Sequence, residues 1–303
     1  MNRPVVIVLM ATHNGEKFLR RQIESILNST LETKIIISDD NSSDSTQKII
    51  SDYSTEKVIL ISNEKKGSVS KNFSYLIKNI PDKFLDENNY YAFSDQDDYV
   101  SKTHYENSIN LMKTKSADLC GSSTINVDEN SNIIGKTNYQ LGSTPFFHFF
   151  ESISPGFTFV FSNRLFTKFR SQMIKNPDQN FFWHDWLLCS FAIESGYETV
   201  VKKYGDVFYR QHTENVTGAR SSLSGTAFRI KKIFDGFYSQ EIINIAKAMS
   251  KYTKKENLIT DLLGGNVKIK DLLNLLLYSR RRTLDRFAAF ISILIIYLNK
   301  KTY

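Results

Sequence analysis

The chain has 303 residues, of which 41% are hydrophobic and 23% charged, so it can bury its own core and is not intrinsically disordered. Its two cysteines, Cys120 and Cys189, are too few for a disulfide framework or a four-cysteine zinc site, which favours a reducing compartment inside the cell. Residues 220–303 carry 16 Lys and Arg against 6 Asp and Glu, whereas residues 1–219 carry 23 against 26, so a basic C-terminal part follows a slightly acidic body.

No apolar stretch reaches the roughly 20 residues that a helix needs to cross a bilayer. The nearest candidate, residues 287–298, is too short and contains Ser292. The apolar run at residues 5–10 is shorter than the core of a typical secretion signal. We therefore expect a cytoplasmic protein without membrane spans, which leaves peripheral membrane contact open.

The first hundred residues alternate between strand-like and helix-like patterns. Strand-like apolar runs, typical of strands buried on both faces, occupy residues 5–10, 34–40, 58–61 and 90–93. Between them we expect one helix capped by Asn14, one that begins at Asp44 or a neighbouring serine, and one over residues 69–80. This order predicts an α/β fold with an open, mostly parallel sheet and flanking helices.

Polar clusters follow three of these strands. They occupy residues 12–14, 39–44 and 95–98. Because ligands of open parallel sheets bind outside the carboxyl ends of the strands, we expect the three clusters to meet at one rim.

The pattern of the second half is mixed. We expect a strand and hairpin edge at residues 118–127 and 132–136, a turn and strand at 155–161, and a helix over 184–193 that ends at Gly196. Short strands are predicted at residues 198–201 and 207–209. After Gly218 the pattern becomes helical and basic.

The acidic run Asp95, Asp97 and Asp98 places three carboxylates within four residues at a strand end. Like charges this close need a counterion or solvent, and a Mg²⁺ or Mn²⁺ ion that bridges to a diphosphate would supply one. The alternative is a solvated acidic turn, which is common in proteins.

Three other polar segments have both a functional and a structural interpretation. The carboxylates of residues 39–44 could recognise a nucleobase and ribose, or could serve as turn and capping residues. Asp185, at an expected helix start, could be a general base or a helix cap. Near residue 210, His212 could ligate a metal and Arg210 could hold a phosphate, or both could be structural.

Taken in order, these segments resemble the motifs of family 2 glycosyltransferases. The likeness lies in residues 8–19, 36–46, 94–98 and 154–159, and then in 184–186 and 209–219, where the chain is similar to bacterial rhamnosyltransferase-type members. Asn41-Ser42-Ser43 stands where the family usually has Gly-Ser-Thr, a mild departure because Asn also tolerates tight turns. The resemblance covers about residues 3–220.

The resemblance implies a GT-A fold, which is a nucleotide-binding parallel sheet joined to a mixed half. Residues 1–219 would be the catalytic domain, with a nucleotide-binding half at 1–100 and an acceptor half at 101–219, and residues 220–303 would be a basic helical extension. The implied activity is inverting transfer of a single sugar, rhamnose being favoured, from a dTDP- or UDP-sugar. The implied acceptor is a cell-surface glycan, such as an O-antigen or capsule repeat unit, that is carried on a lipid diphosphate. Processive relatives carry a Gln-x-x-Arg-Trp motif and membrane spans, and this sequence has neither.

The resemblance also assigns roles to individual residues. Asp185 is the expected catalytic base, and Asp97, Asp98 and His212 are the expected ligands of Mn²⁺ or Mg²⁺. The residues expected to bind the nucleotide sugar are Thr12, Asn14, Asp39, Asp40, Asp95 and Arg210. The residues expected on the acceptor side are Gly156, Thr158, His184 and Trp186.

The basic C-terminal part admits several interpretations. Basic pairs beside apolar segments suit the anionic inner face of a membrane, where a lipid-linked acceptor would be reached. Helices packed on the catalytic domain, or a dimer interface, are the alternatives. Nucleic-acid binding is disfavoured because no aromatic-interleaved basic motif is present.

Two other functions are alternatives to a glycosyltransferase for the chain as a whole. A sugar-phosphate nucleotidyltransferase would need a glycine-rich loop after the first strand, and Gly15 is the one glycine there. A non-catalytic nucleotide-sugar-binding module would be favoured if Asp97 or Asp185 were missing, and both are present.

Overall fold

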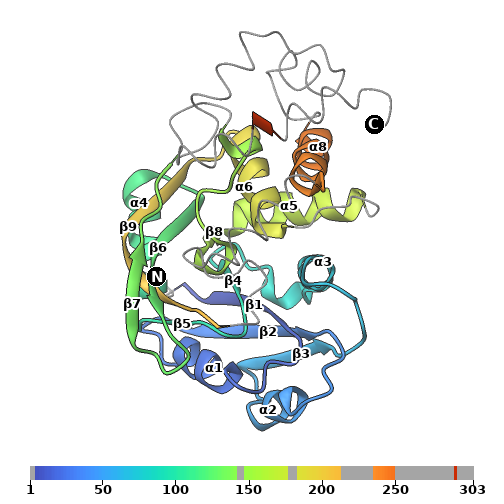
Figure 1. Cartoon of the computed structure of the whole chain (residues 1–303), viewed down its shortest axis with the longest axis vertical. Coiled ribbons are helices and arrows are strands. Elements are labelled where there is room, and N and C mark those ends of the chain that lie inside the picture. The colour runs from blue at the N-terminus through green and yellow to red at the C-terminus, as the bar shows by residue number, and fades with distance from the viewer. Residues whose placement is uncertain (1–3, 142–146, 177–182, 213–234, 250–289, 292–303) are drawn as a thin grey trace.

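The computed structural model describes residues 4–141, 147–176, 183–212, 235–249 and 290–291. A nine-stranded sheet runs through the molecule in the order β3-β2-β1-β4-β8-β6-β9-β5, with β7 paired to β6 (Figure 1). The strands are β1 (Val6–Thr12), β2 (Thr33–Asp39), β3 (Val58–Ser62), β4 (Tyr90–Ser94), β5 (Tyr99–Val100), β6 (Leu119–Val127), β7 (Ile133–Thr137), β8 (Val160–Ser162) and β9 (Thr199–Arg210). The α-helices are α1 (Leu19–Leu27), α2 (Thr46–Asp52), α3 (Val69–Asn79), α4 (His104–Lys115), α5 (Asn163–Lys175), α6 (His184–Glu194) and α8 (Phe237–Met249). The short 3₁₀ helices are η1 (Asp82–Phe84), η2 (Phe147–Phe149) and η3 (Gly156–Thr158).

The predicted parallel half is confirmed. Strands β1 to β4 are mutually parallel where they pair, and β1 lies between β2 and β4. The chain therefore adds β2 and β3 on one side of β1 and β4 on the other, so the strand order reverses between β1 and β4. Such a reversal opens a crevice at the carboxyl ends of the strands. The register places Thr12 opposite Asp39, and Met10 opposite Ser94, so the three polar clusters do share one rim.

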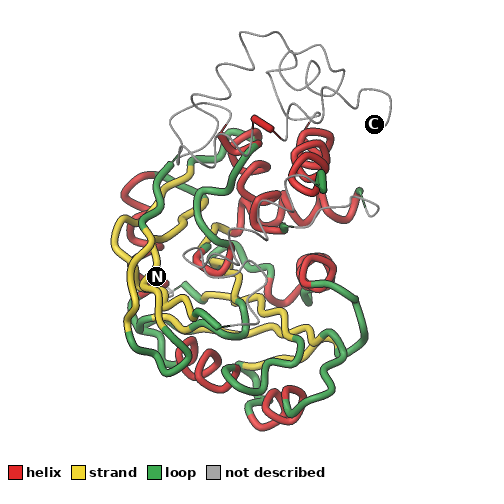
Figure 2. The backbone as a smooth tube through the Cα atoms, viewed as in Figure 1, coloured by secondary structure: helices red, strands yellow, loops and turns green. Residues whose placement is uncertain are grey.

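Both faces of the parallel strands are covered, as their continuous apolar runs predict. Val6, Val8 and Met10 pack with residues of α1, α2 and α4 on one face. Ile7 and Leu9 belong to the core on the other face, which includes residues of α3, α5, α6 and α8. Figures 1 and 2 show α1 and α2 on one side of the strands and α3, α5 and α6 on the other.

The second half is a mixed sheet and departs from the prediction in detail. The turn and strand predicted at 155–161 are confirmed, because Gly156–Thr158 forms the η3 turn and β8 follows it at Val160–Ser162. The two short strands predicted at 198–201 and 207–209 are wrong: Thr199–Arg210 is one strand, parallel to β6 with a register shift between Ser122 and Thr124. Helices α4 and α5 were not predicted.

A buried ionic cluster explains why β9 does not look like one strand in the sequence. Lys202, only 1% exposed, donates to Asp206 at 2.6 Å, and His104 of α4 lies 2.7 Å from the other oxygen of that carboxyl. Pairing with His104 and Lys202 outweighs burial and holds the pKa of Asp206 below its usual range. The charged residues at 202–206 resemble a loop in the sequence, but Lys202 and Asp206 neutralise each other inside the fold.

The predicted helix capped by Asn14 begins later than expected. Helix α1 starts at Leu19, and Asn14 instead has a φ of 48° and accepts a hydrogen bond from the Ser43 backbone N–H at 2.9 Å. Its side chain thus fastens the loop after β1 to the loop after β2.

Helix α8 is the part of the basic extension that the structure describes at length. Ile242, Ile243 and Ile245 of α8 are buried in the core that includes α6. Glu241 accepts a hydrogen bond from the backbone N–H of Trp183, just before α6, at 3.1 Å. Among the described residues, no helix combines the length and apolarity needed to cross a membrane. The predicted domain boundary at 219/220, and most of the basic segments, lie outside the described residues.

Candidate active site

Hydrogen bonds hold the loops after β1 and β2 together at the rim. Thr12 Oγ1 donates to Asp39 Oδ1 at 2.7 Å, and Ser42 donates to both oxygens of Asp39 through its backbone N–H and its hydroxyl, at 2.8 and 2.6 Å. The Gly15 N–H donates to Thr46 Oγ1 at 2.7 Å. Asp39 is completely buried, so its carboxylate holds the shape of this rim from within.

Asp40 fixes a third loop. Its carboxylate accepts hydrogen bonds from the backbone N–H groups of Lys66 and Gly67, which lie between β3 and α3. Asn41, the next residue, has a φ of 56°, a left-handed conformation that Asn adopts more easily than most residues. The structure therefore brings Thr12, Asn14, Asp39 and Asp40 together, as the sequence predicts.

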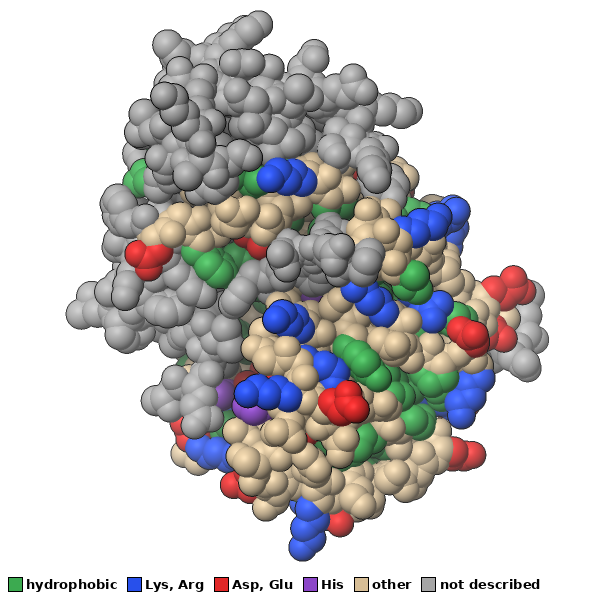
Figure 3. All heavy atoms as spheres, turned by 90° about the vertical axis from the view of Figure 1, so that its right-hand side faces the viewer, with side chains coloured by type: hydrophobic (Ala, Val, Ile, Leu, Met, Phe, Trp, Pro, Cys, Tyr) green, Lys and Arg blue, Asp and Glu red, His purple; other side chains and the backbone are tan. Residues whose placement is uncertain are grey.

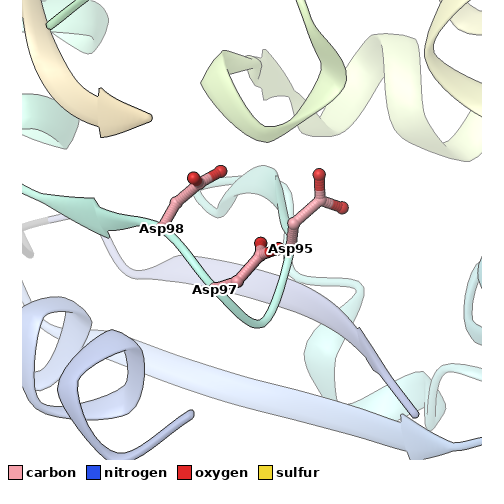
Figure 4. Close-up of side chains that lie close together, drawn as sticks. All are labelled: Asp95, Asp97 and Asp98. Carbon is pink, nitrogen blue, oxygen red and sulfur yellow. The ribbon is translucent and has the colours of Figure 1, made fainter. Parts of the chain in front are cut away.

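The turn between β4 and β5 carries three carboxylates. Asp95, Asp97 and Asp98 each offer an oxygen, and these oxygens lie within 4.8 Å of one another. Figure 4 shows the three side chains on the same turn, with their carboxyl groups directed to the same side of it. Burial, followed by repulsion from Asp97 and Asp185, raises the pKa of Asp95 to about 8.

The acidic turn fits a divalent cation. Asp98 is buried, and its Oδ2 has no hydrogen-bond partner among the residues that the structure describes. Burial and the charges of Asp97 and Asp95 raise the pKa of Asp98 well above its usual range. Clustered carboxylates with an unpartnered buried oxygen are the donor set that Mg²⁺ and Mn²⁺ prefer.

The end of β9 contacts this turn through two residues. His212 Nε2 lies 2.8 Å from Asp97 Oδ2, so the structure places this expected metal ligand beside the acidic turn. The Arg210 backbone N–H donates to Asp98 Oδ1 at 2.9 Å. The Arg210 side chain is buried, and its Nε and NH1 donate to the backbone carbonyls of Asp97 and Glu129 at 2.9 and 2.8 Å. These contacts tie the acidic turn to the loop after β6.

Asp185 approaches the acidic turn from the opposite half of the molecule. It is the second residue of α6, and its Oδ1 accepts from the Trp186 backbone N–H at 2.8 Å. Its Oδ2 accepts from the Gly156 backbone N–H, also at 2.8 Å. Burial raises the pKa of Asp185 to about 6 despite these hydrogen bonds, and its charge helps to raise the pKa of Asp95. The carboxyl group thus has a pKa suited to a base near neutral pH.

Gly156 lies against the start of α6. A Cβ atom at this position would lie 2.5 Å from Asp185 Cβ and 3.2 Å from His184 Nε2. The backbone of η3 can therefore donate to the Asp185 carboxylate only because residue 156 has no side chain.

The other predicted acceptor-side residues are buried and support this region. The His184 ring stacks on Phe73 at a centroid distance of 3.7 Å, and burial lowers the pKa of His184 to about 3, so the ring is neutral. Trp186 Nε1 donates to the His148 carbonyl at 2.6 Å. Thr158 is fully buried, and its hydroxyl lies 2.7 Å from that of Ser154.

One residue at this rim was not singled out from the sequence. Gln96, between Asp95 and Asp97, exchanges two hydrogen bonds with the backbone of His13. Its position inside the acidic motif was a signal, but its partner lies 83 residues away in the chain.

The surface turned to the viewer in Figure 3 shows basic and acidic side chains scattered among neutral ones, with hydrophobic side chains in small patches.

Comparison with known proteins places this geometry in a family. Residues 7–196 match the family model described as glycosyl transferase family 2. The chain is 33% identical to the dTDP-rhamnosyl transferase RfbG of Shigella flexneri over 250 residues, which cover 80% of this chain and 84% of RfbG. It is 31% identical over 114 residues to the UDP-Glc:alpha-D-GlcNAc-diphosphoundecaprenol beta-1,3-glucosyltransferase WfaP of Escherichia coli, which cover 37% of this chain and 42% of WfaP. The fold is similar to that of residues 1–349 of TarS from S. aureus in complex with UDP-GlcNAc, with a TM-score of 0.53, 15% identity and coverage of 98% and 91% of the two chains.

Proposed function

The chain belongs to glycosyl transferase family 2 and is a glycosyltransferase, and from this premise we propose that it transfers one rhamnosyl group from dTDP-rhamnose to a glycan hydroxyl with inversion. The observation that carries the proposal is the position of Asp185 next to the acidic turn. The ring of His184, the residue before Asp185, lies 4.7 Å from the ring of Phe93 in β4, just before the acidic turn, and the Asp185 charge raises the pKa of Asp95. These observations support one site that joins a carboxylate of the second half to the acidic turn of the first half.

In the proposed reaction, Asp185 removes the proton of the acceptor hydroxyl. That oxygen attacks the anomeric carbon of the donor, and the bond from this carbon to the diphosphate oxygen breaks. The sugar is then bonded to the acceptor, the nucleoside diphosphate leaves, and the proton remains on Asp185. Because the oxygen attacks opposite to the leaving group, the anomeric configuration inverts and no second catalytic carboxylate is needed.

Asp97, Asp98 and His212 are the proposed ligands of a Mn²⁺ or Mg²⁺ ion. Asp95, which lies beside them, is proposed to bind the nucleotide-sugar donor. This set of ligands is supported by the Oδ2 of Asp98, which has no partner in the described parts of the chain, and by the close approach of His212 to Asp97. The ion would neutralise charge on the diphosphate as it leaves. Arg210 donates to the backbone of the acidic turn and of the loop after β6, so we propose that it acts on the donor by holding this turn in place.

The nucleoside is proposed to bind at the rim that the loops after β1 and β2 form. Thr12 and Asp39 hold that rim from inside, Asn14 links its two loops, and Asp40 holds the third loop against it. The hydrogen bonds between these residues support a preformed rim rather than four independent ligands.

We further propose that the acceptor is a lipid-diphosphate-linked repeat unit of a surface polysaccharide such as an O-antigen or capsule. WfaP, a relative over part of the chain, acts on a diphosphoundecaprenol-linked sugar by its name. The basic composition of residues 220–303 suits peripheral contact with the anionic inner face of the plasma membrane. Residues 1–219 would then carry the chemistry, and α8 of the extension would support α6.

A panel of nucleotide sugars tests the donor. Purified protein would be mixed with dTDP-rhamnose, dTDP-glucose, UDP-glucose and GDP-mannose in the presence of Mn²⁺, and binding and slow hydrolysis would be measured. We expect the tightest binding and the fastest release of nucleoside diphosphate for dTDP-rhamnose. Tighter binding of UDP-glucose than of either dTDP-sugar would overturn the donor assignment, and binding of no donor under any metal condition would overturn the whole proposal.

A small substitution beside the proposed base should also lower activity. In Gly156→Ala, the new Cβ would have to displace the start of α6, because it would lie 2.5 Å from Asp185 Cβ. We expect donor turnover to fall at least tenfold, because a shift of about 1 Å in a reacting group can cost roughly 10²-fold, and unfolding free energy to fall by about 1–3 kcal/mol. Gly135→Ala, with no atom within 4 Å of the new Cβ, is the matched control. An active Gly156→Ala variant would show that this contact does not position Asp185.

A further inference from the structure

The side chain of Gln96 forms a two-way bridge to the loop after β1. Gln96 Oε1 accepts from the His13 backbone N–H at 2.8 Å, and Gln96 Nε2 donates to the His13 carbonyl at 2.9 Å. The amide thus pairs with the backbone much as a neighbouring strand would. Both hydrogen bonds require the amide to keep one orientation.

Each side of this bridge is firmly held. On the His13 side, the hydrogen bonds of Thr12, Asn14 and Gly15 reach the end of β2, the loop after it and the start of α2, at Asp39, Ser42 and Thr46 respectively. On the Gln96 side, the acidic turn is fastened to β9 by the backbone and side chain of Arg210. The pairing of β1 with β4 ends at Met10 and Ser94, and beyond it the two Gln96 hydrogen bonds are, within the described chain, the ones that join residues 12–16 to residues 94–98.

Gly15 provides the space that this bridge needs. A Cβ at residue 15 would lie 2.4 Å from Gln96 Oε1 and 2.5 Å from its Cδ. The backbone N–H of Gly15 donates to Thr46, so the loop cannot move aside without losing that hydrogen bond. A side chain at residue 15 would therefore push the Gln96 amide out of its place.

Resting on the function proposed above, we propose that Gln96 is a positioning residue that sets the spacing between the nucleoside-binding rim and the metal-binding turn. A nucleoside diphosphate spans both places, with its base at the rim and its phosphates at the acidic turn. Gln96 lies between them and acts through the backbone of His13, without contact with the reacting atoms. Loss of the Gln96 side chain should therefore weaken the binding of ligands that contact the rim and the acidic turn at the same time.

The test compares ligands that bind at the rim alone or at the acidic turn alone with a ligand that binds at both. Dissociation constants would be measured by calorimetry or NMR titration for thymidine, for Mn²⁺ alone, and for dTDP with Mn²⁺, in wild type and in Gln96→Ala and Gln96→Glu. We expect both variants to weaken dTDP binding at least tenfold, and Gln96→Ala, which adds no charge to the acidic turn, to change thymidine and Mn²⁺ binding less than twofold. Gln96→Glu keeps the acceptor for His13 N–H but turns an oxygen towards the His13 carbonyl, so it should not rescue binding. Gln240→Ala, an exposed change on α8, is the control.

A double-mutant cycle with Gly15→Ala tests whether the effect passes through this contact. Gly15→Ala alone is expected to weaken dTDP binding as Gln96→Ala does. In the Gln96→Ala background, Gly15→Ala should add no further loss, because the Gln96 atoms that the new Cβ would strike are gone. Additive losses would overturn the proposal, and so would equal losses for thymidine, Mn²⁺ and dTDP, which would mark a local structural role. Wild-type protein that binds neither dTDP nor UDP would overturn the proposed function, whereas normal dTDP binding by Gln96→Ala would overturn this inference alone.

Discussion

Replacing Asp185 with asparagine is expected to lower kcat/KM by about 10²–10⁴-fold, the range that a general base typically contributes. The substitution keeps the size of the side chain but removes the charge that accepts the proton. An asparagine oxygen can still accept one of the two backbone hydrogen bonds, from Gly156 or from Trp186. The fold should therefore survive, and the loss should appear in turnover and not in the affinity for the donor.

The pH profile of wild-type protein gives an independent check on the same residue. The base must be ionised to accept a proton, and burial raises the pKa of Asp185 to about 6. At saturating Mn²⁺, kcat/KM is therefore expected to fall about tenfold per pH unit below pH 6 as Asp185 becomes protonated, and to level off above it. Raising the pH should not restore the Asp185→Asn variant.

Asp52→Asn is the matched control, because Asp52 is an exposed carboxylate at the end of α2 that pairs with Arg20. It should leave the rate and the pH profile unchanged. If Asp185→Asn retained more than a tenth of wild-type activity, or if its pH profile kept the same acidic limb, another group would have to be the base.

The parallel half of the fold could be predicted because its signals are local. Strands β1, β2 and β4 are apolar on both faces, and each is followed at once by the polar residues that line the rim. The acidic motif at 95–98 is equally local, and so is Asp185 at the start of a helix. The site could therefore be predicted as a set of clusters in a known order.

The remaining features depend on contacts between distant residues. Arg210 looks like a phosphate ligand in the sequence, but its side chain donates to a backbone carbonyl 81 residues away. Strand β9 could not be predicted as one continuous strand, because the charges of Lys202 and Asp206 neutralise each other only inside the fold. Gln96 has no distinguishing mark beyond its place in the motif, since the role proposed for it depends on the loop that folds against it.

Asp97→Asn is expected to lower activity on the order of 10³-fold, because stabilisation of leaving-group charge by a metal ion is worth several kcal/mol and each 1.4 kcal/mol is about tenfold. Removal of metal with EDTA should abolish turnover of the wild-type protein, and added Mn²⁺ should restore it. The variant should need a much higher Mn²⁺ concentration for its residual activity, because one of the proposed carboxylate ligands has been lost. The Asp52→Asn control should respond to Mn²⁺ as wild type does.

Asp97→Asn is expected to lower activity but not to lower the thermal stability of the metal-free protein. The charge of Asp97 raises the pKa of both Asp95 and Asp98, so it repels its neighbours in the metal-free protein. The neutral asparagine removes that repulsion, and its oxygen can still accept from His212, so the metal-free Tm should be equal to or higher than that of wild type. Mn²⁺ at about 100 times its Kd should stabilise wild type by about 2.7 kcal/mol and the variant far less. A metal-free variant that is less stable than wild type, yet gains as much from Mn²⁺, would show that Asp97 is a structural residue and that the metal binds elsewhere.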